Sequence, residues 1–198
     1  MLPILLINPN ASQATTEMMV AMARETAGAK APVRGMTAAQ GPSMITTVEA
    51  LDAAAVRVVA IGLREAGGAC GVIVAAFGDP GTAELKRRLA IPVVGICEAA
   101  MHEAAAGGRR FAVVTTTRNL VARIGECAAQ FGLARHYAGT WVTRGDPLEL
   151  VSNPRRLELA MADAVATCIR QADPGQNFAD AAFTVVGGDA RELRVILE

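Results

Sequence analysis

Four apolar runs in this sequence end in small polar or glycine-rich residues of the kind that bind small molecules. The segments that follow these runs are residues 8–10, 76–79, 115–117 and 187–189. Ligands of open parallel sheets bind beyond the carboxyl ends of the strands, so four such ends predict one shared site. Ordinary helix capping by Asn, Thr and Asp is the alternative explanation of each segment taken alone.

The chemistry expected of these segments is the binding of a small polar molecule through hydrogen bonds. Backbone N–H groups at the helix starts that follow Gly78 and Gly188 would suit a carboxylate or an enolate-like oxygen. The side-chain amides and hydroxyls of the other two segments add donors and acceptors. The predicted substrate-binding residues are Asn8, Asn10, Phe77, Gly78, Thr115, Thr116 and Gly187.

Metal and nucleotide sites are not expected from the sequence patterns. There is no G-x-G-x-x-G after a strand, no G-x-x-x-x-G-K-[ST] loop and no G-x-S-x-G elbow. The spacing of Cys97, Glu98 and His102 does not predict a metal cluster. The four cysteines lack C-x-x-C or other metal-ligand spacing, and we interpret them as reduced thiols of a cytoplasmic protein.

Charge and hydropathy exclude several classes of protein. Among 198 residues, 19 Lys and Arg offset 19 Asp and Glu, and hydrophobic residues make up 52%. Such a chain can bury its own core and is not typical of disorder. A zero net charge without a basic cluster argues against nucleic acid, and no apolar run reaches the roughly 20 residues of a membrane-spanning helix. Residues 1–7 lack a basic region, so no signal peptide is expected.

The elements that must position the candidate residues follow from the hydrophobic pattern. Strands are predicted at residues 4–7, 33–36, 72–75, 93–95, 111–115, 137–140 and 183–186, and helices at 16–27, 48–66, 81–89, 98–106, 120–131, 154–170 and 190–197. Apolar runs without polar alternation are typical of strands buried on both faces. The sequence therefore predicts an α/β fold of mostly parallel sheets flanked by helices.

Three helix starts carry recognisable capping patterns. Thr46-x-x-Glu49 is a capping box ahead of an apolar run. Asp79-Pro80 and Asn153-Pro154 each place a capping side chain before a proline at the first helical position. We expect helices to begin at these three points.

The order of strands and polar ends suggests an internal repeat. Residues 4–10 resemble residues 111–117, and residues 72–79 resemble residues 184–189. Two pseudo-symmetric lobes, residues 1–96 and 97–198, with a cleft between them would explain both pairs. The alternative is that any α/β chain contains pairs of this kind.

Four motifs resemble a known family. INPNAS at residues 7–12, VAAFGDPG at 74–81, PVVGICEAAMH at 92–102 and RFAVVTTT at 110–117 are similar to the hydantoin and allantoin racemase branch of the aspartate/glutamate racemase superfamily. The resemblance runs in order from the N-terminus to about Asp189. It implies two α/β lobes around a central cleft and cofactor-independent racemisation of an amino acid, a hydantoin or a related small acid.

The resemblance also implies where proton transfer takes place. In the family, one cysteine thiolate removes the proton α to a carbonyl, and a second thiol returns a proton to the opposite face. The matching catalytic positions here are Ala76 and Gly188, so neither carries a thiol. Asp79 and Asp189 follow them at matching places, and a carboxylate pair with pKa values raised by burial could substitute. Asp79 also belongs to the motif of cysteine-bearing relatives, where capping explains it.

Two functions stay open at this point. One is a racemase or isomerase that uses other groups, and the other is a catalytically inactive small-molecule-binding relative that has lost the two thiols. A protein similar to arylmalonate decarboxylase or maleate isomerase would also use cysteine at one or both positions. The family continues through a further helix, strand and helix, whereas this sequence ends at Glu198. Because the chain is apolar and lacks that element, we expect a cytoplasmic homo-oligomer with a small-molecule ligand and no nucleic-acid or membrane partner.

Overall fold

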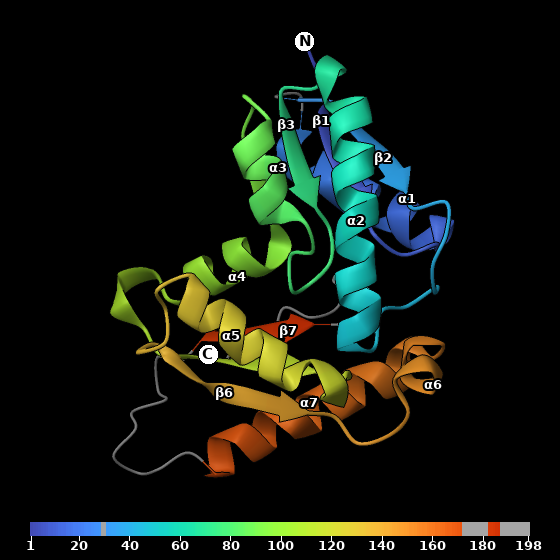
Figure 1. The fold of residues 1–198 in the computed structure, drawn as a ribbon. Helices are drawn as coiled ribbons and strands as arrows, with labels where there is room; N and C mark the ends of the chain where they lie inside the picture. The colour runs from blue at the N-terminus through green and yellow to red at the C-terminus, as the bar shows by residue number, and fades with distance from the viewer. Residues whose placement is uncertain (29–30, 172–181, 187–198) are drawn as a thin grey trace. The chain divides into compact units, whose positions relative to one another are not determined.

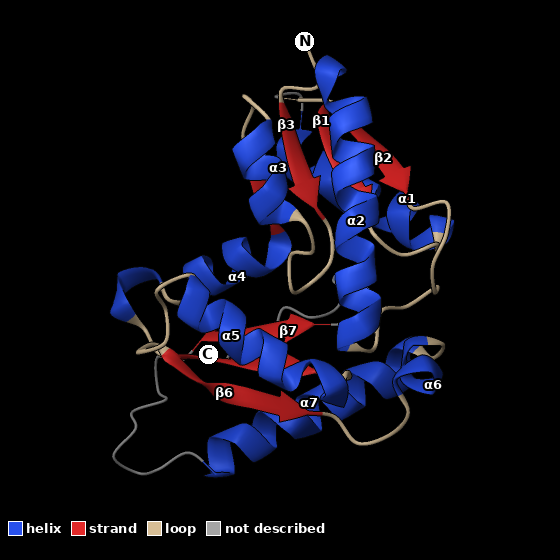
Figure 2. Cartoon of the chain, in the orientation of Figure 1, coloured by secondary structure: helices blue, strands red, loops and turns tan. Residues whose placement is uncertain are grey.

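The protein forms two compact units in a computed structural model that describes residues 1–28, 31–171 and 182–186. The units are Met1–Ala99 and Ala100–Glu198. Each contains its own parallel sheet with helices packed against it (Figures 1 and 2). This confirms the α/β fold predicted from the hydrophobic pattern.

The sheet of the first unit has four parallel strands. They are β1 (Ile4–Asn8), β2 (Val33–Thr37), β3 (Gly71–Val74) and β4 (Val93–Gly95), in the order β2-β1-β3-β4. Strand β1 is central, since Ile4 pairs with Val33 on one side and with Gly71 on the other. Because all four strands run in the same direction, the segments that follow β1 and β3 start from the same edge of the sheet.

Helices cover both faces of this sheet. They are α1 (Gln13–Ala27), α2 (Val48–Glu65) with the 3₁₀ turn η2 (Ala66–Gly68) at its end, and α3 (Thr82–Arg88). Helix α4 (Ile96–Ala104) follows β4 directly and begins in the first unit. On the face covered by α2 and α3 (Figure 1), Leu5 is buried with Val58 and Leu85. On the opposite face, Leu6 is buried with Val20 of α1. The alternation of Leu5 and Leu6 explains why the strand sequence is apolar throughout.

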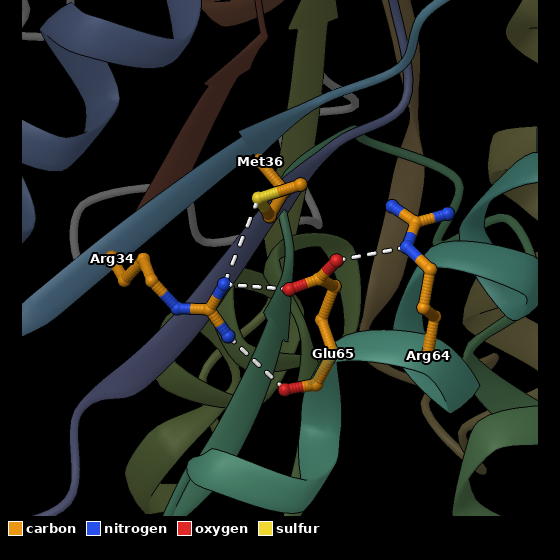
Figure 3. Close-up of polar contacts among 4 residues, drawn as sticks. All are labelled: Arg34, Met36, Arg64 and Glu65. Carbon is orange, nitrogen blue, oxygen red and sulfur yellow. Dashed lines mark hydrogen bonds and ion pairs between the residues drawn. The ribbon is translucent and has the colours of Figure 1, made fainter.

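Strand β2 lies at one edge of the sheet, and both neighbouring helices bond to it. Arg24 of α1 donates to the Val33 carbonyl from Nε and Nη2, at 3.1 and 2.8 Å. On the other face, Arg34 donates to the Glu65 carboxylate at 2.7 Å and to the Glu65 carbonyl at 3.0 Å, at the end of α2 (Figure 3). Hydrogen bonds from Arg34 and then Arg64 hold the pKa of Glu65 below its usual range. These bonds fix the edge strand between α1 and α2.

The sheet of the second unit has three parallel strands within the described residues. They are β5 (Phe111–Thr115), β6 (Tyr137–Val142) and β7 (Ala182–Val186), in the order β6-β5-β7. The helices are η3 (Ala106–Gly108), η4 (Arg118–Leu120), α5 (Val121–Gln130), α6 (Pro147–Val151) and α7 (Pro154–Gln171). Helix α7 contributes Leu157, Met161 and Val165 to a core shared with Val114 of β5. The central strand β5 is buried along its whole length.

Two of the three predicted helix starts are those of α2 and α7. The capping-box prediction is wrong by one residue, because Thr47 rather than Thr46 is the N-cap of α2 and accepts the Ala50 N–H at 3.2 Å. At α7, Asn153 accepts the Arg156 N–H at 3.1 Å, which confirms that start. A threonine pair offers two candidate caps in sequence, and α2 uses the second.

Helix α6 is absent from the sequence prediction, although its signal is present. Asp146 precedes Pro147, and its side chain accepts the N–H groups of Leu148 and Glu149. This is the same capping residue and proline pattern that marks α7. The helix predicted at residues 190–197 lies outside the described residues.

Candidate functional site

Asn8 ends β1, and its fully buried side chain organises the loop that follows. Its Nδ2 lies 2.8 Å from Asn10 Oδ1, 3.0 Å from the Ser12 carbonyl and 2.9 Å from Thr16 Oγ1. Its Oδ1 accepts the Asn10 N–H at 3.1 Å. Asn10 Oδ1 in turn accepts the Ser12 N–H at 2.9 Å. The predicted pair Asn8 and Asn10 is thus brought together, and the Asn8 amide shapes the loop.

The same network reaches the neighbouring strand. Thr16 Oγ1 lies 2.6 Å from Thr37 Oγ1 at the end of β2. The Asn8 carbonyl accepts the Ala38 N–H at 3.0 Å, which extends the β1–β2 pairing by one residue. The ends of two adjacent strands and the start of α1 are therefore joined by buried polar bonds, which favours a loop of fixed shape.

The segment after β3 makes a tight turn that presents Ala76, Phe77 and Gly78 at the edge of the sheet. The Asp79 N–H donates to the Ala76 carbonyl at 3.1 Å, and all three residues are half-buried. Gly78 has φ +108°, and a Cβ there would lie 2.9 Å from Leu51 Cδ2, so the turn needs glycine. Three of the predicted site residues therefore share one small turn.

Asp79 caps helix α4 rather than the helix that follows it in sequence. Its Oδ1 accepts the Cys97 N–H at 2.9 Å, and its Oδ2 accepts the Glu98 N–H at 2.8 Å. Helix α3 instead begins at Thr82, with Gly81 in left-handed conformation as its N-cap. The prediction that Asp79-Pro80 starts a helix is therefore wrong. The aspartate satisfies the exposed N–H groups of a helix 18 residues away in sequence.

The surroundings of Asp79 set its ionisation. Burial raises the pKa of this carboxyl to about 6, against an opposing effect of the Glu98 and Cys97 N–H groups. Gly95 gives the carboxylate its space, since a Cβ at residue 95 would lie 2.0 Å from Asp79 Cγ. The result is a carboxyl group that titrates near neutral pH beside the turn that contains Ala76.

In the second unit, the segment after β5 is equally buried and polar. Thr115 Oγ1 lies 2.8 Å from Thr117 Oγ1 and accepts the Thr117 N–H at 3.1 Å. Thr116 lies between them with 2% of its surface exposed, and its hydroxyl has no hydrogen-bond partner among the residues that the structure describes. The Thr115 carbonyl accepts the N–H of Thr143, the first residue after β6, at 2.9 Å.

This arrangement has a counterpart at the end of β1. There Asn8, Asn10 and Ala38 occupy the places that Thr115, Thr117 and Thr143 occupy at the end of β5. In both units the last residue of the central strand accepts a backbone N–H through its side chain and another through its carbonyl. The two strand ends therefore share local geometry as well as sequence pattern, in agreement with the predicted repeat of residues 4–10 and 111–117.

Three of the predicted site residues, Gly187, Gly188 and Asp189, lie outside the described residues. Among the residues that are described, no three His, Cys, Asp or Glu side chains come together as metal ligands. Within the same part of the chain, no helix has both the length and the apolar character needed to cross a membrane.

A comparison with family models decides the relationship suggested by the motifs. The model of the Asp/Glu/Hydantoin racemase family matches residues 4–176. The chain belongs to this family. Its four motifs and its two units with polar strand ends are therefore features of a racemase-family protein.

Curated members of the family are similar over part of their length. The hydantoin racemase of Rhizobium meliloti is 34% identical over 94 residues, which cover 48% of this chain and 39% of that protein. The hydantoin racemase of Paenarthrobacter aurescens is 28% identical over 137 residues, which cover 68% of this chain and 58% of that protein. The matches thus span less than two thirds of either relative.

Solved structures of two allantoin racemases share the fold of this racemase-family chain. The allantoin racemase from Klebsiella pneumoniae has a TM-score of 0.82 at 29% identity, over 96% of this chain and 76% of that chain. The allantoin racemase from Pseudomonas fluorescens has a TM-score of 0.85 at 26% identity, over 96% of this chain and 79% of that chain. These similarities agree with the hydantoin and allantoin branch indicated by the motifs.

Two residues of interest are missing from the sequence prediction. Gly95 is needed beside Asp79, but nothing in the local pattern indicates that contact. Thr143 is buried at the carboxyl end of β6. The rule that ligands bind beyond the carboxyl ends of parallel strands would have identified Thr143 if the predicted strand had extended to residue 142 rather than 140.

Proposed function

We propose that this chain is a cofactor-independent racemase or isomerase that acts at the α-carbon of a hydantoin, an amino acid or a related small acid. Membership of the Asp/Glu/hydantoin racemase family is the observation that carries the proposal. The polar strand ends of both units support it, because small polar ligands of parallel sheets bind beyond the carboxyl ends of the strands. In this proposal Asn8, Asn10, Phe77, Gly78, Thr115, Thr116 and Gly187 form the substrate-binding residues.

Asp79 is the proposed proton carrier of the first unit. Ala76, at the family position of the first thiol, has no group that can titrate. Asp79 lies three residues further along the same turn, and burial raises its pKa to about 6, which suits a general base near neutral pH. Each of its oxygens accepts one N–H bond and keeps lone pairs for a proton. Asp189 is proposed to serve in the second unit beside Gly188.

The test is exchange of the substrate α-proton with solvent, followed by NMR in D₂O. We expect slow exchange in the wild type that increases as pH rises through about 6, because the carboxylate is the active form. Asp79→Asn should slow exchange by about 10²- to 10⁴-fold, the usual contribution of one general base. Rapid wild-type exchange that survives removal of both carboxyl groups, Asp79 and Asp189, would show that the proton carriers are elsewhere.

Installing the family thiol provides a gain of activity that a folding defect cannot imitate. Ala76 is half-buried in the turn, so Ala76→Cys places a thiol there with little change in volume. We expect this variant to exchange the α-proton faster than the wild type, and Gly188→Cys in addition to convert exchange into racemisation. Ala76→Ser, which has similar size and no thiol, is the control. Equal exchange in the cysteine and serine variants contradicts the assignment of residue 76.

A binding protein without catalysis is the second candidate, favoured by the alanine at residue 76. Thermal denaturation with amino acids, dicarboxylates and hydantoins at millimolar concentration separates the two candidates. Stabilisation without any α-proton exchange supports the binding protein, whereas stabilisation with exchange supports the enzyme.

We also propose a cytoplasmic homo-oligomer. Large apolar side chains are exposed on the second unit, including Leu148 and Val151 of α6 and Leu159 of α7, with exposed fractions of 57%, 41% and 64%. Burial of such side chains between copies would stabilise an oligomer. Sedimentation at micromolar concentration tests this, and a clean monomer contradicts it.

A further inference from the structure

Arg57 of α2 is a basic residue that the proposed site does not use. Its Nε and Nη2 atoms are closed to solvent, and within the described residues neither has a hydrogen-bond partner. The N–H groups of these two nitrogens point the same way and form the fork with which arginine binds an acceptor. Arg24 uses the same fork at the Val33 carbonyl. In Arg57 the fork is complete and unpaired.

An unpaired guanidinium fork is costly to bury. Each buried donor without a partner has lost its hydrogen bonds to water, and the loss is larger when the group is charged. An apolar side chain of similar length would fill the same space without this cost. The segment that covers Arg57 is therefore held over it against an opposing free energy.

That segment belongs to the loop that joins β2 to α2 (Figure 1). A Cβ at Gly41 would lie 3.0 Å from Arg57 Nη2 and 3.5 Å from its Nε, so the Gly41 backbone packs directly against the guanidinium group. Gly41 has φ +122°, a conformation that favours glycine. Residues 39–43, which we call the flap, are all exposed. A single layer of chain thus covers this side of Arg57.

The flap is attached mainly at its ends. Before it, Ala38 is buried and donates its N–H to the Asn8 carbonyl, and after it Met44 is half-buried. Among the described residues, one hydrogen bond joins the flap to another segment, from the Ala11 N–H to the Pro42 carbonyl at 3.0 Å. A segment with few bonds and an exposed surface belongs to the least stable part of a fold.

The single bond of the flap leads to the proposed site. Ala11 lies in the loop after β1, between Asn10 and Ser12, and the Asn8 side chain organises that loop. None of the bonds of the Asn8 side chain involves the flap. Opening of the flap therefore breaks the Ala11–Pro42 bond and leaves the loop after β1 intact.

We propose that residues 39–43 open and close over the loop after β1, and that Arg57 favours opening because its unpaired fork gains water when the flap lifts. The use of this movement, to admit the small molecule, rests on the proposed function. The opening itself follows from contacts within the first unit alone.

Hydrogen exchange of the full-length chain, followed by NMR, tests the flap. The Ala11 amide reports opening, because its acceptor is the Pro42 carbonyl, and the Leu6 amide in the middle of β1 reports unfolding of the sheet. We expect Ala11 to exchange much faster than Leu6. Arg57→Met removes the fork, so it should slow Ala11 exchange by about 10-fold, the effect of removing a buried unpaired donor. Its stability in urea should equal or exceed that of the wild type.

Arg34→Met is the matched control, because the Arg34 guanidinium is bonded to the Glu65 carboxylate and carbonyl. This variant should lower stability and should not slow Ala11 exchange. If Ala11 exchange slows equally in the two methionine variants, Arg57 has no specific role and the inference is wrong.

Gly41→Ala perturbs the same contact from the other side. Its Cβ would meet Arg57 Nη2 and its φ is strained, so Ala11 exchange should speed up by about 5-fold or more. In the Arg57→Ala background the increase should be smaller, because only the strain remains. Equal increases in both backgrounds contradict the contact.

The remaining outcomes separate the flap from the proposed function. Ala11 exchange that is no slower in Arg57→Met than in the wild type overturns the inference. A loss of stability in Arg57→Met also overturns it, because the fork would then support the fold. Slower Ala11 exchange upholds the flap even if no substrate exchanges its α-proton, and that second result contradicts the racemase alone.

Discussion

The contact between Asp79 and Gly95 provides a quantitative test of how the turn after β3 is held. We consider Asp79→Ala, Gly95→Ala and the double variant. The first removes the carboxylate that accepts the Cys97 and Glu98 N–H groups at 2.9 and 2.8 Å. The second adds a Cβ at 2.0 Å from Asp79 Cγ and 2.2 Å from its Oδ2, so the carboxylate must move away from α4. Both single changes therefore break the same two bonds.

The expected change in the free energy of unfolding follows from the loss of the same two hydrogen bonds in both single variants. Removal of a capping side chain costs about 0.5–2 kcal/mol, and bonds to a charged acceptor lie toward or above the upper end. We expect each single variant to lower the free energy of unfolding by about 2 kcal/mol. Asp79→Ala removes the three atoms that lie nearest to a Cβ at residue 95, so the double variant should also lose about 2 kcal/mol rather than about 4. The coupling between the two residues is then about 2 kcal/mol.

Urea denaturation followed by far-ultraviolet circular dichroism gives the four free energies. Hydrogen exchange of the Cys97 and Glu98 amides reports the bonds themselves, and both amides should exchange faster in each variant. Gly71→Ala in β3 is the matched control, because a Cβ there meets nothing closer than the Pro92 carbonyl at 3.4 Å. Its effect should be small and independent of Asp79. Free energies for Asp79 and Gly95 that add within about 0.5 kcal/mol would refute the reasoning.

Other predictions concern ionisation, buried bonds and thiol reactivity. Burial raises the pKa of Asp79 from 3.8 to about 6, so the folded protein holds this proton more tightly than the unfolded chain does. This shift stabilises the folded protein by about 3 kcal/mol below about pH 4, and the contribution is lost as pH rises through about 6. In urea denaturation, the free energy of unfolding of the wild type should fall by about this amount across that range, whereas Asp79→Asn, which has no carboxyl group at residue 79, should lack the fall. Asn8→Ala should lower the free energy of unfolding by about 2–4 kcal/mol, since it breaks a fully buried network, and an effect below about 1 kcal/mol would contradict that role. Under native conditions iodoacetamide should label the exposed Cys70 before Cys168, whose burial raises its pKa to about 11, as peptide mass spectrometry will show. Glu65→Gln should destabilise the protein less than Asn8→Ala in the same denaturation assay, because its ion pair with Arg34 is partly exposed to solvent.

Much of the fold could be predicted from local patterns. The strands predicted at residues 4–7, 33–36 and 111–115 lie within observed strands. The runs at residues 4–7 and 111–115 are apolar because both faces of these central strands are covered, whereas the edge strand β2 contains Arg34 and is only half-buried. The error at Thr46 is of a different kind. Thr46 and Thr47 are equivalent as caps in sequence, and only the path of the chain decides which one accepts the Ala50 N–H.

The sequence was enough to predict that the candidate site residues lie at strand ends, but not which hydrogen bonds each residue makes. The rule for parallel sheets located Asn8, the turn at residues 76–79 and the threonines after β5. It did not indicate that the Asn8 amide bonds within its own loop. Hydrogen-bond partners depend on which loops meet, and that follows from packing rather than from composition.

By itself, the sequence determined the α/β architecture, the polar strand ends and the family, because these depend on residue types and spacing along the chain. Tertiary structure alone decided that Asp79 caps α4 instead of α3, since its partners at Cys97 and Glu98 come close only when β3 and β4 pair. It also decided that the hydroxyls of Thr116 and Thr143 are buried without partners in the described part of the chain. Burial and hydrogen bonding are properties of groups brought together from distant parts of the chain, and no local pattern contains them.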